Sequence, residues 1–257
     1  MQSRAGITKS IWSVSAALAL AWLSVLLSAS ASAVPDKEAA SQMVDSGSFG
    51  VFMGGKRVAT ETFSIHQSST GSSVTSEFKA EAGLNKAAQS SDLQLTSNGD
   101  LKSYEWTESS PGQSHALVVP NQEFLVERFT KSPQEKQHEQ PFLLPASTSI
   151  LDDYFFVQRE VLAWKYLATT CKQENGQIAC PLKQSAQLGT LNAHSQTSAP
   201  VSIQYSGREK IPIRGAEHDL IRLDVKSEAG DWTLWLDDQL KLQRMLDPTS
   251  NTEVIRD

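Results

Sequence analysis

The amino-acid sequence predicts a mainly β protein: a curved antiparallel sheet or half-barrel with one long amphipathic helix packed on its concave face. Apolar and polar residues alternate over many short segments, and turn residues such as Gly, Asn and Ser separate these segments. Only residues 150–168 place apolar residues at helical intervals instead. A single strongly apolar helix among strands has to bury its stripe against the sheet.

The composition is that of a folded, acidic protein. With 257 residues, of which 39% are hydrophobic, the chain is long enough to bury one sizeable core. The net charge of −6 disfavours binding to nucleic acids or to anionic lipids, because such partners attract basic surfaces. The sequence shows no repeat of fixed period, so we expect a single folded domain rather than a repeat array.

The N-terminal segment has the pattern of a secretory signal peptide. Residues 1–10 carry two basic residues and no acid, residues 11–29 are apolar or small, and Ala31-Ser32-Ala33 provides small residues for cleavage. We therefore expect cleavage after Ala33 and an exported protein, periplasmic or extracellular. The alternative is an uncleaved membrane anchor, because 19 such residues could just span a bilayer. Cleavage would leave 224 residues with a net charge of −8, and we expect no stable membrane insertion of that product.

The chain after the cleavage site begins with a polar stretch and continues as strands. Residues 34–46 predict a flexible leader, and residues 47–257 predict a single β-rich domain. The second predicted strand changes the parity of its apolar residues at Phe63, which suggests a β-bulge. Further strands are predicted at residues 74–82, 90–96, 101–107, 115–119 and 123–130, and the charged residues 131–141 are predicted to form a loop.

A helix is predicted over residues 150–168. Ser149 is suited to cap its first turn, and Asp152 stands three residues further on, in the position of a capping-box acid. Together with Asp153, this acid would interact favourably with the helix dipole. The predicted apolar stripe contains Ile150, Tyr154, Val157, Val161, Trp164 and Ala168, and it is widened by Leu151, Phe155 and Leu162.

The rest of the chain predicts strands again. They are expected at residues 177–182, 186–193, 201–205, 210–213, 219–226, 232–236, 240–246 and 253–255. Asp237-Asp238 lies between two of these segments and predicts a hairpin turn.

Cys171 and Cys180 are predicted to form a structural disulfide. Asn175-Gly176 between them is a strong signal for a two-residue hairpin turn. That turn places the two cysteines opposite each other in a non-hydrogen-bonded pair, whose Cα atoms approach to about 4.5 Å, a distance that a disulfide accepts. The eight intervening residues do not match the CxxC spacing of redox-active pairs, and they contain no His that could complete a metal site.

The sequence contains no clear catalytic or cofactor motif. The five His residues have no metal-ligand spacing, so we expect no metal and no cofactor. His218-Asp219 could join a distant Ser in a serine hydrolase, but no Ser lies in a GxSxG or SxxK motif. Asp152-Asp153 could coordinate a cation or line a cleft, although interaction with the helix dipole is the simpler explanation.

The aromatic residues give the one candidate ligand site. A concave sheet covered by an aromatic-rich helix could enclose an apolar cavity. Its candidate lining is Tyr154, Phe155, Trp164, Trp232 and Trp235. Core packing is the simpler interpretation of the same residues.

Three segments of the sequence resemble known proteins. They are GSFGVFMGGKRVATETFSI, SILDDYFFVQREVLAWKYL, and WTLWLDDQLKLQRM with the terminal TEVIRD. Together they resemble a group of uncharacterised secreted bacterial β-proteins, related domains of which precede the catalytic domain of some secreted α/β-hydrolases. This resemblance supplies no catalytic residues. The architecture is also similar to that of the outer-membrane lipoprotein carriers, in which a strongly curved sheet wraps around helices and binds acyl chains.

These observations favour a non-enzymatic binding or carrier module of the cell envelope, with an apolar or acylated ligand. One alternative is a protein-interaction or assembly module whose exposed sheet edge receives a strand from an envelope protein. The other is a serine-type hydrolase. A pocket next to the helix would favour the first, a filled core with an open edge the second, and a Ser within hydrogen-bond reach of a His the third.

Overall fold

The computed structural model describes residues 41–81, 86–174, 177–228 and 230–257. All of them belong to one compact unit, Glu38–Asp257. The predicted signal segment and its cleavage site lie outside the described residues. Within the described ranges, no helix combines the length and the apolar character needed to cross a membrane.

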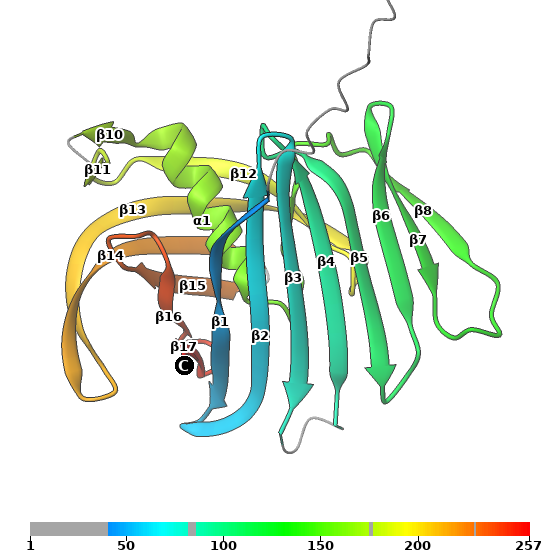
Figure 1. The fold of residues 1–257 in the computed structure, drawn as a ribbon, viewed down its shortest axis with the longest axis horizontal. Coiled ribbons are helices and arrows are strands. Elements are labelled where there is room, and N and C mark those ends of the chain that lie inside the picture. Colours follow the sequence, from blue (N-terminus) through cyan, green and yellow to red (C-terminus); the bar gives the residue numbers. More distant parts are fainter. Residues whose placement is uncertain (1–40, 82–85, 175–176, 229) are drawn as a thin grey trace, which may run out of the picture. The chain divides into compact units, whose positions relative to one another are not determined.

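Fifteen of the described strands form one sheet, whose two arms are joined by the first and last strands of the chain (Figure 1). The first arm contains β1 (Gln42–Met53), β2 (Lys56–Ser68), β3 (Gly71–Ala80), β4 (Ala88–Thr96), β5 (Leu101–Ser110), β6 (His115–Asn121), β7 (Phe124–Thr130) and β8 (His138–Phe142). The second arm contains β12 (Ser185–Asn192), β13 (Thr197–Ile213), β14 (Ala216–Ser227), β15 (Gly230–Leu236), β16 (Leu242–Asp247) and β17 (Thr252–Arg256). β1 pairs with β17, so each arm is an antiparallel meander that runs outward from this junction.

The segment between the arms contains the helix. It comprises β9 (Ser149–Ile150), α1 (Val157–Thr170), β10 (Lys172–Glu174) and β11 (Gln177–Ala179). β9 pairs with β12 in parallel, which is the exception to the predicted antiparallel arrangement. β10 and β11 form a separate two-stranded hairpin. The prediction of a mainly β, largely antiparallel sheet with one helix is therefore confirmed for the described residues.

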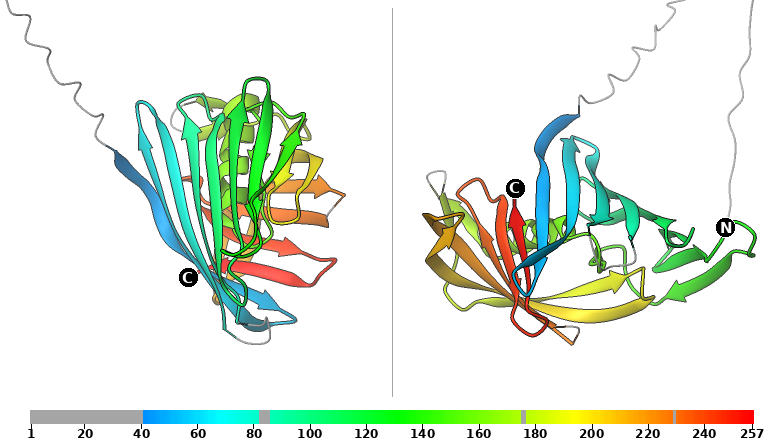
Figure 2. Two further views of the ribbon diagram at one scale, coloured as in Figure 1. Left: turned by 90° about the vertical axis from the view of Figure 1, so that its right-hand side faces the viewer. Right: turned by 90° about the horizontal axis from the view of Figure 1, so that it is seen from below.

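Figure 2 shows β17, in red, beside β1, in blue, at the junction of the two arms. Helix α1 and the residue before it are hydrogen-bonded to both arms. The backbone N–H of Phe156, just before the helix, donates to Glu61 of β2. Trp164 Nε1 donates to the carbonyl of Leu240, between β15 and β16. The Tyr166 hydroxyl accepts from the Tyr205 backbone N–H of β13.

The hydrophobic core contains residues from both arms and from the helix. In β3, Val74, Ser76 and Phe78 are buried whereas Glu77 and Lys79 are exposed, which is the alternation of a strand with one buried face. The largest fully buried side chains are Trp106, Tyr104, Tyr166, Phe49 and Phe155. A second, smaller cluster consists of Ile211, Ile213, Leu220 and Trp235.

The predicted start of the helix is wrong. The helix begins at Val157, and Ser149 and Ile150 belong to β9. The side chain of the N-cap residue, Phe156, makes no capping hydrogen bond. Instead, the carboxylate of Glu61 accepts hydrogen bonds from the backbone N–H groups of Phe156, at 2.7 Å, and Val157, at 3.3 Å. Glu61 of the distant strand β2 thus supplies the cap that the sequence analysis expected from Ser149.

The buried face of α1 also differs from the predicted stripe. Leu162, Ala163, Tyr166 and Leu167 are buried, whereas Val161 and Trp164 are half-buried and Ala168 is exposed. The first turn is buried on all sides and includes the polar residues Gln158, Arg159 and Glu160. The predicted stripe is therefore confirmed at Val157 and Leu162, whereas in the later turns the buried face runs along Tyr166 and Leu167 instead.

Several strand predictions need correction. β1 begins at Gln42, so residues 42–46 of the predicted leader belong to the sheet. The predicted loop at residues 131–141 ends in β8, an exposed edge strand, where Pro141 is tolerated because the edge needs no donor there. The two strands predicted at residues 201–205 and 210–213 form one long strand, β13, with a bulge before Gly207.

The bulge predicted in β2 lies before Ala59 rather than at Phe63, because the pairing of β2 with β1 shifts register between Arg57 and Ala59. β2 pairs with β3 in continuous register, and Ala59, Glu61, Phe63 and Ile65 all face the interior. The interior position of Glu61 interrupts the apolar alternation, so the sequence pattern placed the parity change at Phe63 instead. The predicted Asp237 turn is confirmed: its carboxylate accepts the backbone N–H groups of Gln239 and Lys241.

The predicted disulfide is confirmed. Cys171 and Cys180 are bonded, with their Cα atoms 4.4 Å apart, and Lys172 faces Ala179 in the flanking hairpin. The turn residues Asn175-Gly176 lie outside the described residues. The bridge therefore fixes the segment that follows the end of α1.

Candidate functional site

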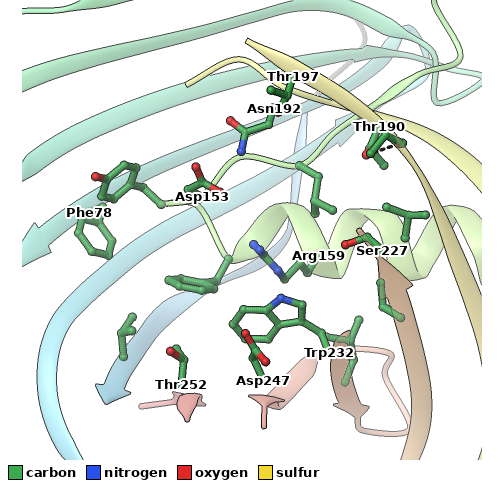
Figure 3. A pocket seen from close by; sticks show the side chains of 18 of the residues that line it. Phe78, Asp153, Arg159, Thr190, Asn192, Thr197, Ser227, Trp232, Asp247 and Thr252 are labelled. Atoms are coloured by element: carbon green, nitrogen blue, oxygen red, sulfur yellow. Dashed lines mark hydrogen bonds between the residues drawn. The ribbon is translucent and has the colours of Figure 1, made fainter. Parts of the chain in front are cut away.

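A cavity of about 300 Å³ lies beside the first turn of α1 (Figure 3). Its walls come from both arms of the sheet, from the segment before the helix and from the helix itself. The apolar part of the lining includes Val51, Val58, Phe78, Val225 and Leu234. Because strands from the two halves of the chain meet here, no single segment of the sequence contains the site.

Two aromatic pairs form part of the cavity walls. Tyr154 lies edge-on to Phe78, with 5.2 Å between the ring centres. Phe156 lies 5.9 Å from Trp232, measured in the same way. Aromatic walls provide large apolar surfaces with little flexibility, which suits the binding of an apolar group.

The only cationic side chain among the described lining residues belongs to Arg159. Its guanidinium carbon lies 4.7 Å from the centre of the Trp232 ring and 5.2 Å from that of Phe156, within the range of cation–π interactions. Figure 3 shows this side chain next to the Trp232 indole, among the residues that line the cavity. The guanidinium is therefore held in place by aromatic rings rather than by a carboxylate.

Polar groups also converge on the cavity. Asp153, Asn192 and Thr197 contribute to the lining, and Asp153 is exposed to solvent. Asp247 is a further lining residue, but its carboxylate accepts the N–H of Thr249 and a hydroxyl hydrogen bond from its own turn. A mostly apolar pocket with a few converging polar groups has the composition of a ligand site.

The carboxylate of Glu61 caps the helix whose first turn borders the cavity. Besides the two backbone N–H groups, it accepts a hydrogen bond from the Ser76 hydroxyl at 2.7 Å. Burial raises the pKa of Glu61 from 4.5 to about 7, although these hydrogen bonds and the positive charge of Arg159 lower it. This residue therefore connects β2, β3 and the start of α1.

A second buried polar cluster lies next to the segment before the helix. The Tyr104 hydroxyl donates to the Asp152 carboxylate at 2.9 Å, and the Asp152 N–H donates to Gln158 Oε1 at 2.6 Å. Burial raises the pKa of Asp152. Glu127 of β7 is fully buried, neither of its carboxylate oxygens has a hydrogen-bond partner in the described part of the chain, and burial raises its pKa to about 8. The hydrogen bonds of Asp152 join the segment before α1 to β5 and to the first turn of the helix, and none of these groups lines the cavity.

The acids predicted for the first helical turn therefore have other roles. Asp152 is buried before the helix and bonded to Tyr104, so it does not interact with the helix end as a capping-box acid. Asp153 lies at the cavity, as one of the two alternatives for it suggested.

The structure brings only two of the five predicted lining residues to this cavity. Tyr154 and Trp232 line it. Phe155 is fully buried in the main core, and Trp164 lies beside two other cavities, of about 310 and 410 Å³, along the later turns of the helix. Trp235 belongs to the smaller core cluster, where its Nε1 donates to Glu209.

Sequence reasoning missed Arg159, Glu61 and Phe78. A charged residue inside a helical segment predicts a position on the solvated face of the helix. A Glu in a strand likewise predicts an exposed position. Only the burial of both residues reveals their roles. The interrupted alternation at Glu61 was the one signal that could have identified an inward-facing acid.

The residues proposed for hydrolysis are not assembled. His218 is exposed on β14, and Asp219 forms an ion pair with Arg208 at 3.2 Å. Among the described residues, no hydrogen bond joins a His to a Ser; His115 is bonded to Glu105. Nor does any group of three or more His, Cys, Asp or Glu side chains in these ranges have a metal-binding arrangement.

Comparisons with known proteins identify a related fold. No protein-family model matches the sequence. The curated proteins contain no match either. Among solved structures, the chain is similar to a β-barrel-like protein of domain of unknown function DUF1849 from Brucella abortus, with a TM-score of 0.51 and 8% sequence identity. The superposition covers 82% of this chain and 93% of that one.

At this level of identity the similarity concerns the fold alone. It supports the predicted resemblance to β-proteins of unknown function. The likeness to the outer-membrane lipoprotein carriers stays a prediction. The described part of the chain thus has a β-barrel-like fold, shared with a domain whose function is unknown.

Proposed function

We propose that the protein is an exported, non-enzymatic binding or carrier module of the cell envelope that holds a small apolar or acylated ligand in the cavity beside α1. The observation that carries this proposal is the combination of aromatic walls, at Tyr154 and Trp232, with converging polar groups around about 300 Å³ of space. This volume is at the lower end of the range for ligand pockets. The helix then covers the concave face of the sheet and forms one wall of the site.

Export is proposed from two features that agree with each other. The N-terminal residues have the pattern of a cleaved signal peptide. The Cys171–Cys180 bridge suits an oxidising compartment, since such bridges are rare in reducing ones. A periplasmic or extracellular location follows from the proposal.

The assembly-module alternative is less favoured. It requires an edge that accepts a further strand, and β8 lies at one end of the sheet. β8 is only five residues long and contains Glu139 and Pro141. Short length, charge and Pro are features that natural edge strands use to prevent pairing with other chains.

Ligand binding can be tested on the exported protein with uncharged and charged ten-carbon chains, 1-decanol and decanoate. We expect calorimetry to show binding of at least one chain, and tryptophan fluorescence to change because Trp232 lines the cavity. Trp232→Phe should keep an aromatic wall and remove most of the fluorescence change.

A cavity-filling variant locates the binding. Ala199 lines the cavity from β13, so the larger side chain of Ala199→Phe should fill part of the space that the ligand occupies. We expect this variant to bind the ligand about tenfold more weakly, or weaker still. Ala216→Phe, at an exposed position of β14, is the matched control and should bind like the parent protein. Native mass spectrometry of protein purified from its host envelope provides an independent measurement. Recovery of only the unliganded mass, together with no calorimetric signal for either chain, would overturn the proposed function.

A further inference from the structure

The Arg159 side chain lies in the cavity without an anionic partner of its own. It is 8% exposed, and its Nη1 donates to the backbone carbonyl of Asp152 at 3.3 Å. No salt bridge to Arg159 is present in the described part of the chain. A guanidinium has five N–H donors, so most of its hydrogen-bonding capacity is unused by the protein.

Three of the four acids whose charges act on Arg159 are engaged elsewhere; the fourth, Asp153, is exposed to solvent and forms no salt bridge with Arg159 in the described part of the chain. Glu61 caps the helix and accepts a hydroxyl hydrogen bond. Asp152 accepts the Tyr104 hydroxyl, and Asp247 accepts hydrogen bonds from its own turn. Burial lowers the pKa of Arg159, while the surrounding acids oppose this effect. A buried cation that is not paired is costly, because desolvation is not offset by a close negative charge.

Resting on the proposed function, we propose that the ligand of this cavity is a single-chain fatty acid whose carboxylate pairs with the Arg159 guanidinium. The planar guanidinium matches a carboxylate through two parallel hydrogen bonds. The apolar chain would lie against Val51, Val58 and Val225, which line the same cavity.

The charges and the volume of the cavity favour this class over other amphiphiles. Arg159 is the single cation among the described lining residues, whereas Asp153 and Asp247 are also part of the lining. A doubly charged phosphate would therefore leave one negative charge unpaired near two acids, while a carboxylate carries the one charge that Arg159 can match. A cavity of about 300 Å³ also suits one short chain better than a lipid with two chains.

The test compares ten-carbon chains that differ only in the head group: decanoate, 1-decanol and decylammonium, titrated into the exported protein by calorimetry at pH 8. We expect decanoate to bind about 10- to 100-fold more tightly than the alcohol, the range for a hydrogen-bonded charge pair. Decylammonium should bind no more tightly than the alcohol, because Arg159 repels it.

Substitutions at the cavity assign the effect to a residue. Arg159→Met should remove the preference for decanoate, so that decanoate and 1-decanol bind to this variant with equal affinity. Arg244→Met is the matched control, because Arg244 also stacks on a tryptophan, Trp235, at 5.2 Å but lies away from the cavity. Asp153→Asn should strengthen decanoate binding by removing a repelling charge, and the exposed Glu123→Gln should not.

These measurements separate the two proposals. Two outcomes overturn the pairing with Arg159 and leave the proposed binding function intact. One is equal affinity of the parent protein for decanoate and 1-decanol, and the other is tighter binding of decylammonium than of either chain. Binding of none of the three chains overturns both proposals. If Arg159→Met does not fold, the head-group series on the parent protein and the Asp153→Asn variant still decide the outcome.

Discussion

Glu127 allows a direct test of how burial acts on this fold. Its side chain on β7 is fully buried, and its carboxylate oxygens have no hydrogen-bond partner among the described residues. Burial raises its pKa from 4.5 to about 8, although the Gln196 side chain lowers it; the charge of Asp152 adds a smaller upward contribution. The folded protein therefore keeps this group protonated over a pH range in which the unfolded chain ionises it.

The sign of the effect follows from proton binding. Between pH 4.5 and about 8 the folded state binds one proton more than the unfolded state at Glu127, so the free energy of unfolding falls as the pH rises through this range. The full difference between the two pKa values corresponds to about 5 kcal/mol. We expect about 2 to 5 kcal/mol to be measured, since a chain relaxes around a buried charge.

The assay is urea unfolding of the parent protein and of Glu127→Gln at pH 5 and pH 9. The amide resembles the protonated acid, so the two proteins should have similar free energies of unfolding at pH 5. At pH 9 the variant should be the more stable by the amount above, because it cannot ionise. Other groups, including Glu61, titrate in both proteins, and their contributions cancel in the comparison. A difference between the two proteins that stays constant from pH 5 to pH 9 would refute the reasoning.

Three further predictions concern the helix, the bridge and the signal segment. Glu61→Ala should lower the free energy of unfolding at pH 8 by about 2 kcal/mol, because the helix loses its cap, whereas Glu61→Gln should lose less; urea unfolding distinguishes them. Replacing Cys171 and Cys180 by Ser should cost about 2 to 3 kcal/mol, and thiol titration of the unfolded, unreduced parent protein should find no free thiol. N-terminal sequencing of the exported protein should begin at Val34, and a start at residue 1 would indicate a retained anchor.

Most strands could be predicted because their signals are local. Alternation and turn residues fixed β3, β5 and β14 to within a few residues, since one face of each strand is buried and the other is wet. The predictions were wrong where a long-range contact replaces a local one. Glu61 faces the core because it caps the helix at Phe156, 95 residues away. No pattern of residues within β2 indicates this partner.

The beginning of the helix shows the same limit. Ser149 and Asp152 match a local capping pattern, yet Ser149 pairs with β12 and Asp152 accepts the Tyr104 hydroxyl. Both interactions become available only when the sheet is assembled. Tertiary contacts therefore outweighed a capping signal whose contribution is typically about 1 kcal/mol.

The sequence by itself determined the predominantly β character, the single helix and the Cys171–Cys180 bridge, because periodicity and turn chemistry act over a few neighbouring residues. Only the tertiary structure decided which side chains share the cavity. The guanidinium carbon of Arg159 lies 4.7 Å from the centre of the Trp232 ring, although Arg159 belongs to the helix and Trp232 to a strand of the second arm. Their proximity depends on the packing of the helix against the second arm, and Arg159 becomes buried only when that packing is formed.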